Sequence, residues 1–238
     1  MSDALDAKLT ARRQAEMVAR LRSLVRPQGP QGRNGSAQDL NGASTAAADV
    51  ETCDLCGKGL DADHRHLLHL VDRSILCACE SCIALRSGDA ELRPTGTRTV
   101  WLEDFELPDE VWAALDVPIG LAFFIDSSAS GGVVALYPSP AGATESGIPP
   151  EVWRDLRTAN PVLMSLDTDS EGLIVNRIAD PPEYAIAPID ECYRLVGLIK
   201  ANWDGISGGA GPEQAIEAFF AELRERAEGL GGLREAAG

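Results

Sequence analysis

Two short cysteine-rich stretches, "CDLCG" at 53–57 and "CACESC" at 77–82, decide how the first part of the chain folds. They contain five of the six cysteines in the 238-residue chain. The spacing is C-x2-C, then twenty residues, then C-x-C-x2-C. Two C-x2-C knuckles this far apart are typical of a zinc ribbon, in which four thiolates bind one ion. The spacing therefore predicts a metal site with the ligands Cys53, Cys56, Cys79 and Cys82.

A β-hairpin is expected between the two knuckles. The segment "HRHLLHLVDRSILCAC" reads as two short strands around the turn "VDRS", which contains Asp72 and Arg73. Such a hairpin would bring the second knuckle beside the first. We therefore predict a small zinc-ribbon-like module over 53–86, followed by a loop over 87–97.

Two cysteines, Cys77 and Cys192, are not among the four predicted ligands. Side chains two residues apart on a strand face the same way, so we expect Cys77 to lie on the same side as Cys79. There it would be an alternative metal ligand, or a spare thiol that is buried for structural reasons. Cys192 lies on a predicted helix far along the chain, and we expect it to pack in the core.

The three histidines of the chain all lie in the hairpin segment. We expect His64 and His66 to share one face of the first strand and His69 to point to the other. Imidazole nitrogen is a good zinc ligand, so a histidine could contact the metal. With five thiols nearby, however, no histidine is required.

Iron is the alternative metal. "CDLCG" also matches the first knuckle of rubredoxin, an electron-transfer protein with iron in four thiolates. The second knuckle, "CESCI", lacks the proline and glycine that usually follow the cysteines in rubredoxin. The dense C-x2-C-x2-C run of a cubane iron–sulfur cluster is also missing. The sequence therefore favours zinc and leaves iron open.

The N-terminal part of the chain has a different composition. Apolar residues recur at helical spacing over 3–26, so we predict an amphipathic helix over 1–26. Residues 27–52 are rich in Pro, Gly, Ser and Ala and predict a disordered linker. The basic N-terminal arm could fold back on the acidic body or reach an acidic partner.

The rest of the chain, 97–230, is predicted to form an α+β domain with a mainly antiparallel sheet. Neighbouring strands joined by short turns indicate antiparallel pairing, and we expect the helices to cover one face of the sheet. "GLAFFID" and "VVALYPS" should form a hairpin, and "EYAIAPI" should pair with "GLIVNRI". The expected strands are 99–103, 120–126, 133–139, 172–178 and 183–189. The expected helices are 108–115, 149–156, 160–166, 190–203 and 212–227.

Charge and composition exclude several classes of function. The formal net charge of −16 disfavours binding to nucleic acid or to an anionic membrane. We find no secretory signal and no apolar run long enough to span a bilayer, which predicts a cytoplasmic protein. In that compartment clustered cysteines bind metals more often than they form disulfides.

Signals for catalysis are weak. Residues 97–230 contain no histidine, and the chain has only three lysines. The glycine-rich segment 205–214 lacks the Lys-Ser/Thr of a phosphate-binding loop. We therefore assign no catalytic residue and expect a protein that is not an enzyme.

The stretch "YPSPAGATES" at 137–146 is polar, rich in small residues and bracketed by prolines. We interpret it as a loop after a strand, and loops of this kind often carry function. It is either a rigid turn or a site that binds a partner. The residues suggested for such binding are Tyr137, Ser139, Thr144 and Glu145.

Several motifs together resemble an uncharacterised bacterial family of unknown function. They are "CDLCG", "HRHLLHLVDRSILCACESC", "GLAFF", "YPSPAGATES", "PIDECYRLVGLI" and "GISGG". The resemblance covers roughly 53–228. Genes of that family commonly lie beside [NiFe]-hydrogenase genes in actinobacterial clusters. The resemblance therefore implies a role in hydrogenase assembly or operation, with a hydrogenase subunit or maturation factor as partner, and it implies no catalytic residue.

Overall fold

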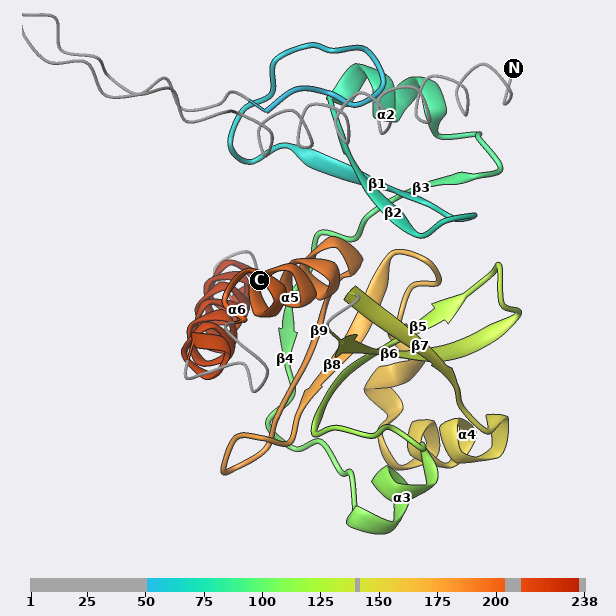
Figure 1. The fold of residues 1–238 in the computed structure, drawn as a ribbon, viewed down its shortest axis with the longest axis vertical. Coiled ribbons are helices and arrows are strands. Elements are labelled where there is room, and N and C mark those ends of the chain that lie inside the picture. Colours follow the sequence, from blue (N-terminus) through green and yellow to red (C-terminus); the bar gives the residue numbers. More distant parts are fainter. Residues whose placement is uncertain (1–50, 140–141, 204–210, 236–238) are drawn as a thin grey trace, which may run out of the picture. The chain divides into compact units, whose positions relative to one another are not determined.

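The computed structural model describes residues 51–139, 142–203 and 211–235, with side chains as far as residue 227 (Figure 1). These residues all belong to one compact unit, 47–238. The predicted helix over 1–26 and nearly all of the predicted linker over 27–52 lie outside the described residues. The division of the chain into four segments stays a prediction.

The cysteine-rich segment forms a small antiparallel sheet with one helix. The sheet order is β2-β1-β3, and the strands are β1 (Arg65–His69), β2 (Ser74–Ala78) and β3 (Leu92–Pro94). The predicted hairpin is confirmed: β1 and β2 are antiparallel, and the turn places Arg73 at a φ of 52°. Two elements were not expected. Helix α2 (Glu80–Arg86) follows the first cysteine of the second knuckle, and β3 lies in the segment that we predicted to be a loop.

The larger sheet has six strands, all antiparallel, in the order β4-β9-β8-β5-β6-β7. Both predicted strand pairings, β5 with β6 and β8 with β9, are confirmed. Strand β7 was not predicted and forms one edge of the sheet. The strands are β4 (Val100–Trp101), β5 (Leu121–Ser127), β6 (Gly132–Ser139), β7 (Gly142–Gly147), β8 (Glu171–Asn176) and β9 (Glu183–Pro188).

Helices cover both faces of this sheet, so the expectation of a single covered face was wrong (Figure 1). Neighbouring residues of one strand show the reason. Phe123 is buried in the cluster with α5 and α6, while Phe124 is buried in the cluster on the opposite face. All six residues of β8 are buried, and a strand that is apolar on both faces needs cover on both sides. The helices are α3 (Asp109–Ala114), α4 (Pro150–Ala159), the 3-10 helix η1 (Pro161–Ser165), α5 (Ile189–Ala201) and α6 (Gly211–Glu235).

Hydrogen bonds join the small sheet and the segment after it to the start of α5 and to the residue before β8. The His66 ring and the Asp190 carboxylate are 2.8 Å apart, and the Gly96 N–H donates to the Ser170 carbonyl at 2.8 Å. A side chain at position 96 would not fit, because a Cβ there would lie 2.8 Å from the Glu171 Cγ. Leu68 of β1 also belongs to the core cluster that contains α5 and α6. The cysteine-rich module over 53–86 therefore shares packing with the larger sheet.

Candidate metal centre

The first knuckle is a tight turn that aims two sulfurs in one direction. The Gly57 N–H donates to the Cys53 carbonyl at 2.8 Å, and the Cys53 N–H donates to the Lys58 carbonyl at 2.8 Å. Gly57 has a φ of 77°, a left-handed conformation that glycine adopts without a steric penalty. The glycine in "CDLCG" is therefore what allows the turn.

The second knuckle is built from the end of β2 and the start of α2. Cys79 is the residue before α2, and its carbonyl accepts the N–H groups of Cys82 and Ile83 at 2.9 and 3.0 Å. Ile83 is the buried residue of this helix. The helical turn brings the Cys82 side chain back toward Cys79.

The two knuckles bring together the four cysteines that the spacing singled out. The sulfurs of Cys53, Cys56, Cys79 and Cys82 all lie within 4.8 Å of one another, and those of Cys56 and Cys79 are 3.8 Å apart. A zinc–sulfur bond of about 2.3 Å in a tetrahedral site implies a sulfur–sulfur distance of about 3.8 Å. None of the chain's six cysteines, all of which are described, forms a disulfide. The cluster could therefore hold a metal ion; that these four are the ligands stays a prediction.

Backbone groups favour the thiolate form of Cys53. Burial raises the pKa of this thiol, but hydrogen bonds from the backbone at Cys79, Leu55 and Cys56 outweigh that effect and lower the pKa to about 6. Burial, together with hydrogen bonds to the other cysteines, raises the pKa of Cys82. Thiolate is the form that binds metals, so the lowered pKa of Cys53 favours binding of a cation, which would release protons from the other thiols.

Cys77 does not group with these four cysteines, and its expected position on the same side as Cys79 is not what brings it to its place. Its sulfur lies within 4.8 Å of a ring nitrogen of His64 and of His66, and it pairs with His66 across β1 and β2. Strand alternation relates residues only within a strand, and β2 ends at Ala78, before Cys79. The expected packing role of Cys192 is confirmed, because this residue is fully buried in the core with α5.

His64 and His66 lie together and His69 lies apart, as expected, although His64 precedes β1 and is not part of the strand. The His64 and His66 rings have centroids 4.7 Å apart, whereas the His69 Nδ1 lies 2.7 Å from the Asp72 carboxylate in the hairpin turn. The hydrogen bond to Asp190 raises the pKa of His66 although burial opposes it. None of the three groups with the four cysteines. The grouping of His64 and His66 with Cys77 is the site that sequence reasoning missed, and the shared strand face was its only signal.

Comparison with known proteins gives one match. Residues 52–227 match the profile of a family of unknown function, DUF5947. The chain belongs to this family. No curated protein and no solved structure matches it. The matched range contains both knuckles and the larger sheet.

The stretch predicted to be a partner-binding loop is a hairpin in this DUF5947 protein. Tyr137 and Ser139 lie on β6, and Thr144 and Glu145 lie on β7, with Tyr137 directly opposite Thr144. The turn at 140–141 lies outside the described residues. Glu145 forms an ion pair with Arg73 of the metal module. The strand was missed because Gly, Ala and Ser have low strand propensity, and binding of a partner here stays a proposal.

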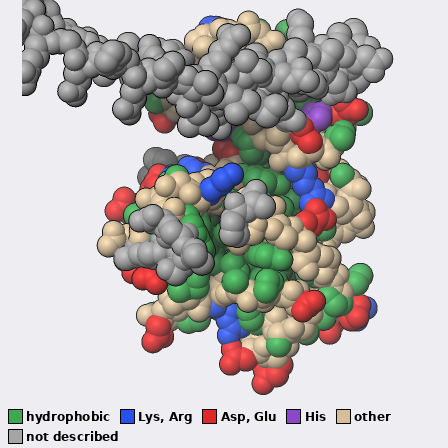
Figure 2. Space-filling model, in the orientation of Figure 1, with side chains coloured by type: hydrophobic (Ala, Val, Ile, Leu, Met, Phe, Trp, Pro, Cys, Tyr) green, Lys and Arg blue, Asp and Glu red, His purple; other side chains and the backbone are tan. Residues whose placement is uncertain are grey.

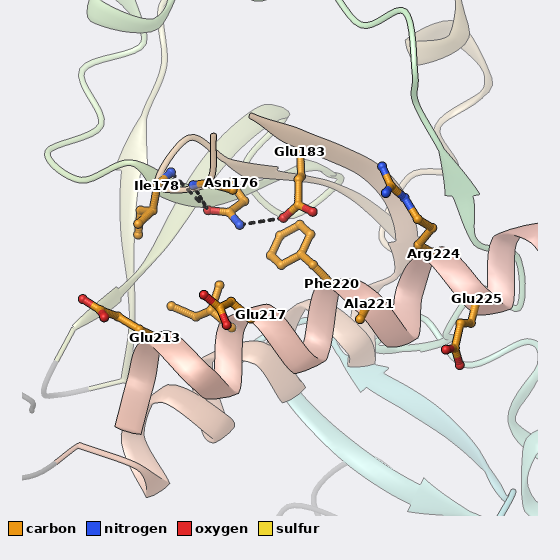
Figure 3. Close-up of a pocket in the computed structure, with 11 residues that line it drawn as sticks. Asn176, Ile178, Glu183, Glu213, Glu217, Phe220, Ala221, Arg224 and Glu225 are labelled. Carbon is orange, nitrogen blue, oxygen red and sulfur yellow. Dashed lines mark hydrogen bonds between the residues drawn. The ribbon is translucent and has the colours of Figure 1, made fainter. Parts of the chain in front are cut away.

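A groove of about 610 Å³ lies between α6 and the ends of β8 and β9 (Figure 3). The Asn176 amide donates to the Glu183 carboxylate at 2.9 Å, and the Arg224 guanidinium lies 4.3 Å from the centre of the Trp101 ring. Among the described residues, the lining side chains include no histidine, cysteine or lysine, so they offer carboxylates without a strong nucleophile. The groove is lined by Asn176, Ile178, Ala179, Glu183, Glu213, Ile216, Glu217, Phe220, Ala221, Arg224 and Glu225.

A helix that crosses a bilayer must be both long and apolar. Among the described residues, no helix of this DUF5947 protein is both long and apolar enough to cross a membrane.

Proposed function

We propose that this protein is a zinc-binding accessory protein that is not an enzyme. One observation carries the proposal: four cysteine sulfurs converge within 4.8 Å of one another. Four thiolates complete the tetrahedral coordination of zinc, so no position is left for a substrate or a reactive water. A closed site of this kind stabilises a fold, and the ion would hold the two knuckles of the module together.

Iron in the same four thiolates would make a rubredoxin-like electron carrier, the alternative function. The geometry suits both ions, since both take tetrahedral sulfur ligands. The sequence of the second knuckle favours zinc, because α2 begins directly after Cys79 and the rubredoxin pattern of Pro and Gly is absent. The colour and the metal content of the purified protein separate the two functions.

The partner that we propose is a hydrogenase subunit or a maturation factor, and the location is the cytoplasm. The resemblance noted from the sequence motifs supports this partner. The surface supports contact with a protein: Figure 2 shows acidic side chains around the margins of the larger sheet unit and hydrophobic ones grouped nearer the middle of the visible face. Edge strand β7 adds a backbone that a partner strand could extend.

Affinity capture from a hydrogenase-expressing host tests this partner. The tagged protein should recover a hydrogenase subunit or maturation factor that the tag alone does not recover. Glu145→Lys, on β7, should reduce the recovery several-fold, because it reverses a charge on the proposed contact strand. Glu151→Lys, an exposed charge reversal on α4, is the matched control and should leave the recovery unchanged.

Two results would count against these proposals. Recovery of no hydrogenase or maturation protein by the unmodified chain would contradict the proposed partner. Equal recovery by the Glu145 and Glu151 variants would contradict the proposed contact at β7.

A further inference from the structure

We propose that His64, His66 and Cys77 form a second metal site, distinct from the four-cysteine cluster. Each residue offers one ligand atom, and these three atoms lie within 4.8 Å of one another. Two imidazoles and one thiolate suit a zinc-class divalent ion. The proposal does not depend on what the four-cysteine cluster binds.

The β1–β2 hairpin holds two of the three ligands, because His66 is directly opposite Cys77 in the antiparallel register. His64 comes just before β1, and its ring lies beside that of His66, with the ring centroids 4.7 Å apart. The backbone around Cys77 is held by the first knuckle. The Cys77 N–H donates to the Asp54 carboxylate at 2.7 Å, and the Asp54 N–H donates to the Cys77 carbonyl at 2.8 Å.

The outer hydrogen bonds of the two rings are those of metal-binding histidines. The His66 Nδ1 lies 2.8 Å from the Asp190 carboxylate, and the His64 Nδ1 lies 2.9 Å from the Asp61 carbonyl. A histidine that binds a metal through one nitrogen commonly donates the other N–H to a carboxylate or a carbonyl. In both residues Nε2 is the nitrogen left for an ion.

The Nε2 atom of His64 is a polar atom that lacks a hydrogen bond among the described residues. The His64 side chain is only 6% exposed, and this atom is buried. An unsatisfied buried polar atom costs free energy, and such atoms are rare in folded proteins. A metal ion bound to this nitrogen would remove that cost.

The second site differs from the four-cysteine cluster in what it could do. Three protein ligands leave the fourth position of a tetrahedral ion open to water or to a small ligand. The site also lies where the hairpin meets α5, because its outer carboxylate, Asp190, is in the first turn of that helix. An ion here would fix the orientation of His66 toward Asp190. Its loss should loosen the contact between the module and the larger sheet.

Counting zinc in the full-length protein tests the proposal. After saturation with zinc and removal of the excess under reducing conditions, the protein should retain two ions per chain if both clusters are filled. Cys77→Ser and His66→Gln should each lose one ion and keep the other. His69→Gln is the control, because His69 is another histidine of β1 beside a carboxylate but belongs to neither cluster, and it should keep both ions.

X-ray absorption at the zinc edge gives a readout that does not depend on how well a variant folds. In the unmodified protein, five thiolates and two imidazoles should be shared between the two ions. Zinc with sulfur neighbours only would overturn the proposal, as would equal zinc content in the unmodified protein and Cys77→Ser. Loss of zinc from His69→Gln to the same extent as from His66→Gln would also overturn it.

Discussion

Replacing Cys53 with Ser should strip the bound metal from the protein and unfold the module over 53–86. Cys53 is fully buried, and its thiolate is the anion that the backbone stabilises. In small zinc peptides the binding of the ion supplies on the order of 10 kcal/mol of folding free energy. Elemental analysis should find the variant free of zinc, and limited proteolysis should cut within 53–86. Because the His64–His66–Cys77 cluster is built on the same hairpin, any ion there should be lost too.

Removal of a thiol elsewhere is the control for this experiment. Cys192→Ala deletes a buried sulfur in the larger core, so it should cost about 1 kcal/mol and leave the zinc content unchanged. Cys79→Ser should behave like Cys53→Ser. Full zinc content in both the Cys53 and Cys79 variants would show that these residues are not ligands.

Arg98→Ala should produce the largest loss of stability outside the module. The Arg98 guanidinium binds both oxygens of Glu171, at 2.7 and 2.8 Å, and the Glu171 side chain is only 3% exposed. Without Arg98 the carboxylate would be buried with no cation beside it and would keep only the Asp167 N–H, at 3.3 Å, which costs about 3–5 kcal/mol. The melting temperature should fall by roughly 10 °C.

Arg154→Ala is the matched control, because Arg154 and Asp155 form an ion pair whose side chains are both more than 70% exposed. Its loss should change stability by less than about 1 kcal/mol. Equal melting temperatures for the two arginine variants would contradict the structural role given to the Glu171 pair.

The parts of the fold that follow from local chemistry could be predicted from the sequence. The C-x2-C spacing and Gly57 together specify a tight turn, and the two knuckles do bring their four cysteines together. The helices expected over 149–156 and 160–166 are found close to those bounds, and each begins at a proline, which costs no hydrogen bond in the first turn. These features depend on a few neighbouring residues.

Features that depend on distant residues were not predictable in this way. Edge strand β7 has weak strand propensity and forms because β6 provides a partner. Helices cover both faces of the sheet because β8 is buried along its whole length. The central position of β8 is known only once all the strand pairings are known. His66 and Asp190 are 124 residues apart in the sequence, and no spacing motif predicts that they are in contact. The cluster of His64, His66 and Cys77 could therefore be identified only from the structure.

Metal analysis of the unmodified protein tests the central claim most directly. The protein should be purified from a host that is supplied with both iron and zinc, without added chelator. We expect a colourless protein that carries zinc, with thiolate sulfur as the main neighbour in X-ray absorption. A red protein with about one iron per chain would contradict the zinc assignment and establish the electron-carrier alternative. A reduced, folded protein with no metal would contradict a metal-binding function altogether.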